Sequence, residues 1–375
     1  MNHEISRAGP RRKVRVGVVG AGYWGPNLTR NIAELADAEL IGIADLDESQ
    51  RDRARRRYPA SIVTSDFNDF FDNYVDAVVI ATPPATHFAI ASAFLERGVH
   101  CLVEKPLAGT IEESRALLSI AAINKAVLMV GHTFEYNPAV REIRRLIDSG
   151  ELGEIFYIDA VRTNLGIFQM RTNVMWDLAP HDISIANYLL DAKPVSVGAQ
   201  AGSFIMRDVG INDLAYLHME YPGGQLANIR VSWLDPNKTR RTTVVGSKKM
   251  LIYDDVANLE KIRIYDKGLT DPPFVDSYGE LQCSYRYGNV TIPHLSWEEP
   301  LRLECEDFIT SILGGTVPQA DGESGLRVVQ ALAAADRSLE LGRVVELSEL
   351  DSKVLATEAF NSSEVSTGQQ TITTS

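Results

Sequence analysis

The sequence is poor in the features that mark several classes of protein. Three cysteines occur in 375 residues, Cys101, Cys283 and Cys305, far apart and without the CxxC spacing of a zinc site. They predict unpaired core thiols in a reducing compartment rather than a disulfide framework. No apolar run approaches the length of a membrane span, and the first residues contain no apolar signal segment. We therefore expect a cytoplasmic protein without a membrane partner.

Positive charge is scarce as well. Lys and Arg number 37 against 50 Asp and Glu, so the formal net charge is −13. This balance argues against a nucleic-acid partner, which needs a basic face. The sequence also lacks an HExxH motif, a Cys/His cluster and a GxSxG elbow, so neither a metal site nor a serine nucleophile is expected. The remaining composition, 45% hydrophobic and 23% charged, is that of a globular protein long enough for two domains.

The sequence does contain a β-turn-α-β pattern from Val14 to Asp45. An apolar run precedes the turn GAGYWG, a helical pattern follows it, and a second apolar run ends on Asp45. A GxGxxG triplet alone is a weak signal, but this context is the one that dinucleotide binding requires, and it disfavours a turn without a ligand. Gly20 suits the tight turn, Gly22 lets a pyrophosphate approach the backbone, and Gly25 allows close contact of helix and sheet.

Asp45 lies where an acidic partner of the ribose 2′-hydroxyl is expected, about 20 residues after the glycines. A carboxylate there would repel a 2′-phosphate, which favours NAD over NADP. Arg51 and Arg53 follow shortly and could soften that preference.

Alternating strand and helix patterns continue to about residue 132. The apolar run Ala77–Ala81 is typical of a parallel strand buried on both faces, and a further strand over Val99–Val103 leads to Glu104 and Lys105. Loops at the carboxyl ends of such strands face the ligand crevice of an open α/β sheet. Together with the glycines, the candidate cofactor-binding residues are Tyr23, Trp24, Asp45, Thr82, Pro83, His87, Glu104 and Lys105.

The second half of the chain has a different pattern. Strands are predicted over Ile155–Thr163, Val195–Ala201, Asp213–Tyr221, Gln225–Trp233, Arg240–Gly246 and Lys249–Asp254, interrupted by one long helix over Ala179–Leu190. Successive strands without intervening helices predict an α+β domain with a large, mostly antiparallel open sheet. The fold class is thus α/β. We expect a loose extension over 1–13, a Rossmann domain over 14–132, and a substrate-binding and oligomerisation domain over 133–356. Its helices Leu301–Leu313 and Ser324–Leu341 are expected to pack back on the first domain, and the Ser- and Thr-rich tail 357–375 to be disordered.

Two groups of residues are candidates for the chemistry. Lys105 ends a buried strand in the predicted crevice, where it could hold a substrate hydroxyl; the alternative is a surface lysine paired with Glu104. Asp177 and His181 are four residues apart, so they share one face if the segment is helical. Histidine titrates near neutral pH, which suits removal of a proton from an alcohol.

Alternatives remain open for this second group. Asp177 could instead cap the helix, with Pro180 in its first turn, while His181 could be structural and Asp182 a solvated charge. Weaker candidates for substrate contacts lie at the change of pattern and at the end of the first strand after it: Tyr136, Asn137, Arg162 and Asn164.

These motifs together resemble the Gfo/Idh/MocA oxidoreductases over nearly the whole chain. The matching segments are GAGYWG, ATPPATH at 81–87, EKPLA at 104–108 and WDLAPHD at 176–182. The resemblance implies a nicotinamide-dependent enzyme that acts on a secondary hydroxyl or ketone of a sugar-like ring. It also implies that Lys105 and His181 are the catalytic pair with Asp177 nearby, and that the open sheet forms a homodimer or homotetramer.

Within that family, GYWGPNL and RTNLGIFQ followed by WDLAPHD are most similar to nucleotide-sugar 3-dehydrogenases for UDP-N-acetylglucosamine-type substrates. Related sugar 3-ketoreductases often have a tyrosine where this chain has His181. We therefore predict NAD-dependent oxidation at C3 of a nucleotide-activated amino sugar. The alternatives are a dehydrogenase of an aminoglycoside ring, a keto-sugar reductase of antibiotic biosynthesis, a catalytically silent NAD-binding protein, and a glycosidase that uses NAD transiently.

Overall fold

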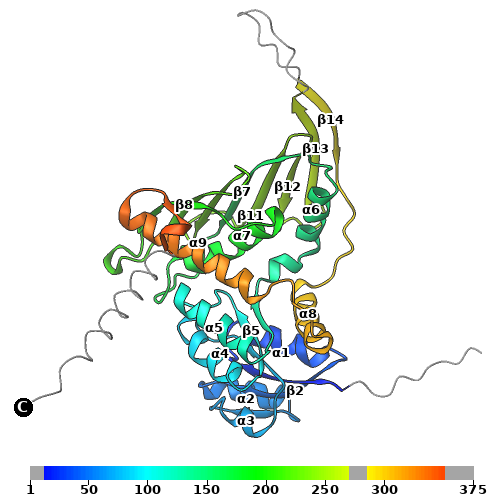
Figure 1. Ribbon diagram of the computed structural model, residues 1–375, viewed down its shortest axis with the longest axis vertical. Coiled ribbons are helices and arrows are strands. Elements are labelled where there is room, and N and C mark those ends of the chain that lie inside the picture. The colour runs from blue at the N-terminus through cyan, green and yellow to red at the C-terminus, as the bar shows by residue number, and fades with distance from the viewer. Residues whose placement is uncertain (1–11, 270–284, 351–375) are drawn as a thin grey trace, which may run out of the picture. The chain divides into compact units, whose positions relative to one another are not determined.

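The computed structural model describes residues 12–269 and 285–350 (Figure 1). The described residues form two compact units, one within Met1–Ile143 and His294–Val329 and one within Arg144–Pro293 and Gln330–Ser375. The predicted tail 357–375, most of the predicted extension 1–13, and Cys283 lie outside the described residues. Cys101 and Cys305 are buried free thiols, which confirms the prediction for these two cysteines.

The described residues of the first unit contain a six-stranded sheet in the order β3-β2-β1-β4-β5-β6, with every neighbouring pair parallel. Its strands are β1 Val14–Val19, β2 Ala38–Ala44, β3 Ile62–Thr64, β4 Ala77–Ile80, β5 His100–Glu104 and β6 Leu128–Gly131. All four residues of β4 are fully buried, as its continuous apolar run predicts. The strand order reverses between β1 and β4, which is where an open α/β sheet binds ligands at its carboxyl edge.

Helices follow the strands of the first sheet as the alternation predicts, and two more helices come late in the chain. They are α1 Gly25–Glu34, α2 Glu48–Arg57, α3 Asp69–Asp72, α4 His87–Leu95, α5 Ile111–Ile123, α6 Pro138–Asp148, α8 Pro300–Gly314 and α9 Gly322–Leu341, with short 3₁₀ turns η1 Pro84–Thr86 and η2 Thr133–Tyr136. The capping residue of α5 is Thr110, whose Oγ1 accepts a hydrogen bond from the backbone N–H of Glu113 at 3.1 Å. Glu113 in return accepts from the N–H of Gly109 at 3.0 Å. The Thr-x-x-Glu pattern therefore marks the start of this helix.

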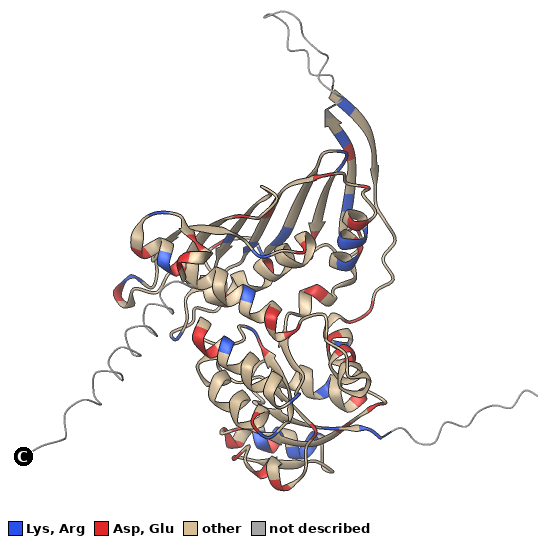
Figure 2. Ribbon diagram, viewed as in Figure 1, with Lys and Arg blue, Asp and Glu red and all other residues tan. Residues whose placement is uncertain are grey.

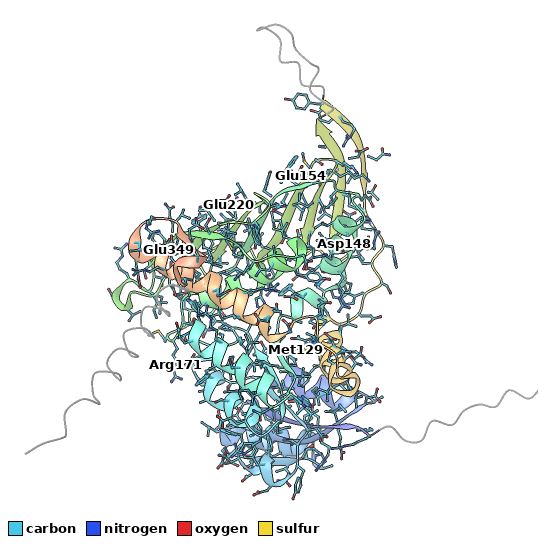
Figure 3. All side chains as sticks on the ribbon, viewed as in Figure 1. Met129, Asp148, Glu154, Arg171, Glu220 and Glu349 are labelled. Atoms are coloured by element: carbon cyan, nitrogen blue, oxygen red, sulfur yellow. The ribbon has the colours of Figure 1, made fainter. Side chains whose placement is uncertain are left out.

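The first unit also takes in segments from beyond residue 132. Helix α8 contacts α1, β1 and η2, and the Tyr136 hydroxyl donates to Asp307 of α8 at 2.7 Å. Met129 of β6, labelled in Figure 3, is fully buried and forms a β-bridge with Asp321 just before α9. A Cβ at Gly325 of α9 would lie 3.0 Å from Leu107. Because these contacts are internal to the first unit, that unit extends beyond the predicted range 14–132.

The described residues of the second unit form a nine-stranded sheet in the order β14-β13-β12-β11-β7-β10-β9-β8-β15. Its strands are β7 Ile155–Thr163, β8 Ser196–Gly202, β9 Leu214–Glu220, β10 Leu226–Ser232, β11 Thr239–Gly246, β12 Met250–Asp254, β13 Ile262–Leu269, β14 Tyr285–Thr291 and β15 Val345–Glu346, with the 3₁₀ turn η3 Arg207–Val209. Among these strands β7 and β10 pair in parallel and the other neighbours are antiparallel, which confirms a mostly antiparallel sheet. The last three strands were not predicted. Strand β14, for one, is exposed along nearly its whole length, so its side chains do not alternate between buried and exposed.

Helix α7, Val174–Leu190, lies on this sheet and contacts β7, β9 and β10 (Figure 1). It is longer than the predicted Ala179–Leu190. Its cap is Asn173, whose side chain accepts from the N–H of Trp176 at 3.0 Å. The alternative that Asp177 caps the helix, with Pro180 in the first turn, is therefore wrong, because an asparagine four residues earlier already takes that place.

The sheet has a second face, on which alternate residues remain exposed. Tyr157, Tyr216 and Leu226 are each more than a third exposed, whereas their neighbours Ile158, Ala215 and Ala227 are buried. Acidic and basic residues are interspersed over both units (Figure 2). Among the described residues, no helix has both the length and the apolar character to cross a membrane.

Candidate active site

The glycine turn follows β1, and each of its glycines meets a different steric condition. Gly20 has a φ of +98°, and a Cβ there would lie 2.6 Å from the carbonyl oxygen of Ala81. A Cβ on Gly25 would lie 2.0 Å from the Gly20 carbonyl oxygen. At Gly22, by contrast, no described atom lies within 4 Å of the Cβ position. The turn thus closes on itself at Gly20 and Gly25 and leaves open space at Gly22.

This open space lies at the start of α1. Within the described residues, α1 begins without a side-chain cap and has no acidic residue in its first turn. Its first N–H groups are therefore left for an anion, which is how such turns hold a pyrophosphate. The residues present fit a dinucleotide.

Asp45 is held beside this turn. Its Oδ2 accepts from the N–H of Ala21 at 2.5 Å, and its Oδ1 accepts from the N–H of Asp47 at 2.8 Å. Arg51 donates to the Asp45 carbonyl oxygen at 2.7 Å and pairs with Glu48. These bonds hold the Arg51 guanidinium beside Asp45, and its effect on the preference for NAD over NADP stays a prediction.

His87 connects the loops that follow β4 and β5. The residue is fully buried, with Nδ1 2.9 Å from the Pro106 carbonyl oxygen and Nε2 2.9 Å from the Thr82 carbonyl oxygen. Burial lowers the pKa of His87, although the two carbonyls favour the charged ring. The side chain therefore holds the Thr82–Pro83 loop in place, and a direct contact of His87 with the cofactor stays a prediction.

Lys105 follows β5 directly, next to a carboxyl group with unusual surroundings. The Lys105 backbone N–H donates to Glu104 Oε2 at 3.2 Å. The Glu104 carboxyl carbon lies 3.1 Å from the position that a Cβ of Gly131 would occupy, so a side chain there would crowd the carboxyl group. Burial raises the pKa of Glu104 to about 7, against the opposing effect of Lys105. Glu104 is consequently not the solvated partner that a surface lysine would have.

Further buried acids lie near Lys105 and Glu104, and no motif in the sequence marks them. Glu304 of α8 accepts from Thr133 Oγ1 at 2.5 Å, and Glu135 of η2 accepts from Ser324 Oγ at 3.3 Å. Burial raises the pKa of Glu135 to about 8 and that of Glu304 well above its ordinary value. Within the described part of the chain, Glu104 Oε1, Glu304 Oε1 and both ring nitrogens of His132 are buried without a hydrogen-bond partner.

His132 is the fourth member of this group. Burial lowers its pKa to about 3, with a smaller contribution from the charge of Lys105. The surroundings of Lys105 in the first unit therefore favour neutral acids and a neutral imidazole. The described residues contain no group of three or more His, Cys, Asp or Glu side chains that could hold a metal ion.

In the second unit, α7 presents Asp177 and His181 one turn apart, as their spacing predicts. Asp177 Oδ2 accepts from the indole N–H of Trp233 at 3.0 Å. Asp182 is 4% exposed and forms a two-bond ion pair with Arg162 of β7, at 2.6 and 3.0 Å. The alternative that Asp182 is a solvated charge is therefore wrong. Arg162 attaches the helix to the sheet, and its contact with a substrate stays a prediction.

The remaining candidates also have internal partners. The hydroxyl of the fully buried Tyr136 donates to Asp307 and accepts from the N–H of Ala320 at 3.1 Å. Asn137 accepts from the N–H of Ala139 at the start of α6. The backbone N–H of Asn164 donates to the Ser232 carbonyl oxygen at 3.2 Å.

The two aromatic residues of the glycine turn are exposed. Tyr23 is 90% exposed and Trp24 is 38% exposed.

Trp233 is the residue of the second unit that the sequence analysis missed. The sequence pattern predicts it only as the end of the strand Gln225–Trp233. Its place becomes visible in the fold through the parallel pairing of β10 with β7, in which Ser232 lies opposite Thr163. Parallel strands place their carboxyl ends at one edge, so Trp233 lies beside the segment that begins with Asn164.

Comparison with known proteins identifies the family of this chain. Residues 14–132 match the model described as oxidoreductase family, NAD-binding Rossmann fold, and residues 140–252 match the GFO/IDH/MocA C-terminal domain. UDP-N-acetylglucosamine 3-dehydrogenase of Acidithiobacillus ferrooxidans is 29% identical over 326 residues, which cover 85% of this chain and 95% of that enzyme. Inositol 2-dehydrogenase of Rhizobium meliloti is 28% identical over 351 residues, covering 89% and 99%.

A solved structure of the Acidithiobacillus ferrooxidans enzyme has a TM-score of 0.71 to this chain at 27% identity, and the match covers 87% and 97% of the two chains. The two domain models, the matched lengths and the glycine turn agree with one another. The chain belongs to the Gfo/Idh/MocA family of NAD-binding sugar and polyol oxidoreductases.

Proposed function

We propose that this enzyme oxidises a secondary ring hydroxyl, at C3, of a nucleotide-activated amino sugar of the UDP-N-acetylglucosamine type. The observation that carries the proposal is Lys105 at the carboxyl end of β5, beside Glu104, in the same unit as the glycine turn. The Acidithiobacillus ferrooxidans relative supports the substrate class, since it aligns over most of both chains.

The cofactor would be held by the glycine turn and Asp45. Gly22 leaves room for the pyrophosphate, and the fixed carboxylate of Asp45 receives the ribose hydroxyls while disfavouring the phosphate of NADP. When bound, NAD supplies the acceptor for the hydride that leaves the substrate carbon.

The protein supplies proton transfer and orientation. Lys105 steadies the oxygen of the reacting hydroxyl, and His181 takes its proton, since an imidazole exchanges protons near neutral pH. Asp177, one turn before His181 on α7, orients the substrate or the imidazole.

A second candidate substrate is a cyclic polyol. The inositol 2-dehydrogenase of Rhizobium meliloti matches this chain at 28% identity over 89% of its length, close to the figures for the sugar enzyme. Inositols share with the sugar a ring that carries secondary hydroxyls. They differ by lacking the nucleotide, so the two substrates can be separated in one assay.

The assay measures NADH absorbance with purified enzyme, NAD or NADP, and a panel of UDP-sugars, dTDP-sugars, amino sugars, aminoglycosides and inositols. We expect reduction of NAD with a UDP-amino sugar. Lys105→Ala and His181→Ala should each lower turnover by roughly a hundredfold or more. Lys193→Ala, an exposed lysine after α7, is the matched control and should keep full turnover.

Several outcomes would contradict the proposal. Unchanged turnover of His181→Ala would remove its role as the base. NAD binding without turnover on any ring alcohol or keto-sugar would favour a silent binding protein. Glycoside hydrolysis without net NADH would indicate an enzyme that uses NAD transiently.

We further propose that the exposed face of the nine-stranded sheet joins two copies of the chain. Tyr157 and Leu226 lie opposite each other in the β7–β10 pairing, and Tyr216 lies on the same face. Light scattering should show a dimer or a tetramer. Tyr216→Lys should shift the equilibrium from the oligomer toward the monomer. A monomeric wild-type enzyme would contradict this.

A further inference from the structure

Trp233 contacts a predicted catalytic residue without any need to touch the substrate itself. The residue directly after β10 is 1% exposed, and its indole N–H donates to Asp177 Oδ2 at 3.0 Å. An indole has one donor and no acceptor, so this is the hydrogen bond that the ring can make. The bond joins the sheet to the helix that also carries His181.

The ring of Trp233 is held by its own surroundings. Its backbone N–H donates to the Asp213 carbonyl at 3.0 Å, and its carbonyl accepts from the N–H of Gly166 at 2.9 Å. Phe168 packs edge-on against the indole, with 5.8 Å between ring centroids and an angle of 66°. A Cβ on Gly166 would lie 3.2 Å from the indole, so glycine permits the close approach. The donor therefore has a fixed position.

A fixed donor sets the orientation of the carboxylate that it binds. Rotation of the Asp177 carboxyl group about its Cβ–Cγ bond would break the bond from Trp233, and the fixed indole cannot follow. The same residue supports the segment from Asn164 to Phe168, which contains another candidate for substrate binding: its backbone carbonyl binds the N–H of Gly166 and its ring packs against Phe168. Trp233 thus contacts two parts of the chain that carry candidate substrate contacts.

We propose that Trp233 is a positioning residue for the ring-hydroxyl reaction: its N–H orients the Asp177 carboxylate, and its ring supports the Asn164–Phe168 segment. This inference rests on the proposed function. Its rival is a purely structural role, in which Trp233 fills space and any buried aromatic ring would serve equally well.

Trp233→Phe separates the two roles, because phenylalanine keeps an aromatic ring against Phe168 but has no donor. The matched control is Tyr221→Phe. Tyr221 is a buried aromatic residue directly after β9, and its hydroxyl donates at 2.8 Å to Asn187, also on α7. Both substitutions remove one buried donor to a side chain of the same helix. Only the first acts on Asp177.

We expect Trp233→Phe to lower kcat/KM for the sugar by tenfold or more, with the Kd for NAD unchanged. Tyr221→Phe should stay within twofold of wild type at a comparable loss of Tm. In a background of Asp177→Ala, Trp233→Phe should have no further effect on kcat/KM, because it acts through that carboxylate. Equal kcat/KM for the two phenylalanine variants, or full additivity with Asp177→Ala, would overturn the inference.

Two further measurements keep the test decisive. Phe168→Leu, at a partly exposed position, retains the hydrogen bond but weakens the ring contact, and it should lower kcat/KM twofold to fivefold even if Trp233→Phe does not fold. If the wild-type enzyme oxidises no ring alcohol, the proposed function fails. A crystal structure of Trp233→Phe then decides the inference separately, because an Asp177 carboxylate in its wild-type orientation would refute it.

Discussion

The two units differ in how the buried side chains beside their predicted catalytic residues are bonded. In the second unit, four side chains of α7 each have a bonded partner on another segment: Asp182 with Arg162, Asp177 with Trp233, Asn187 with Tyr221, and Trp176 with Asp336. Of these, Asn187 also has a buried Nδ2 without a partner among the described residues. In the first unit, Glu104 and His132 at the carboxyl ends of β5 and β6, and Glu304 of α8, each have a buried polar atom that has no partner among the described residues.

This difference suits two different tasks in a catalytic site, which are the orientation of a group and the change of its protonation state. A buried polar group without a partner costs about 1–3 kcal/mol, so it survives where it serves a purpose or where water completes it. Paired groups fix orientation, which suits the helix that carries Asp177 and His181. Unpaired acids change protonation state, which suits the neighbourhood of Lys105, where Glu104 has a pKa of about 7.

The largest expected effect comes from breaking a pair in the second unit. Asp182→Asn leaves the Arg162 charge buried and should lower the free energy of unfolding by about 3–5 kcal/mol. Replacing both residues together, by Arg162→Met with Asp182→Leu, should recover most of that loss. The control is Asp148→Asn in the exposed Arg144–Asp148 pair of α6, where about 0.5 kcal/mol or less is expected. Urea denaturation measures all three, and a loss near that of the control would refute the pairing argument.

The next largest effect concerns the protonation of a buried carboxyl group in the first unit. Glu135 has a pKa of about 8 in the folded protein, above its ordinary value. The folded state therefore binds protons more tightly than the unfolded state from about pH 5 to 8. Stability should fall as pH rises through this window, by roughly 1.4 kcal/mol per pH unit for one such group.

Glu135→Gln removes that titration. The decline of the unfolding free energy between pH 5.5 and 7.5 should become shallower by up to about 1.4 kcal/mol per pH unit. Glu323→Gln, at an exposed position in the first turn of α9, is the matched control and should leave the slope unchanged. Urea titrations at several pH values give the slopes. Equal slopes for wild type and Glu135→Gln would show that Glu135 is ionised in the fold.

The same contrast explains what the sequence could predict. Strand and helix periodicity predicted the β/α alternation of the first sheet, including β1, β2, β4 and β5, and six of the nine described strands of the second, because those elements bury one face or both. The strand-end position of Lys105 and the helical spacing of Asp177 and His181 made these residues candidates, and their catalytic roles stay a prediction. Local pattern contains no information about which distant strands pair, so the parallel contact of β7 with β10, and with it Trp233, was not accessible.

Buried acids were missed for a related reason. Glu135 and Glu304 look like ordinary solvated glutamates in the sequence, since their burial depends on α8 packing against η2 from far along the chain. The sequence left the surroundings of Asp182 open for the same reason, because its partner Arg162 lies on another element. Side chains whose environment is set by distant segments need the fold before their role can be stated.

The smallest expected effect on stability tests whether the first unit also keeps space open for its ligand. Gly22→Ala adds a methyl group where no described atom lies within 4 Å, so the free energy of unfolding should change by about 0.5 kcal/mol or less. The methyl group would occupy the space assigned to the pyrophosphate, so the Kd for NAD should rise tenfold or more. The control is Gly25→Ala, whose Cβ would lie 2.0 Å from the Gly20 carbonyl oxygen. It should cost roughly 1–3 kcal/mol of stability or more. Calorimetry with NAD and thermal melts separate the two, and unaltered NAD binding by Gly22→Ala would place the pyrophosphate elsewhere.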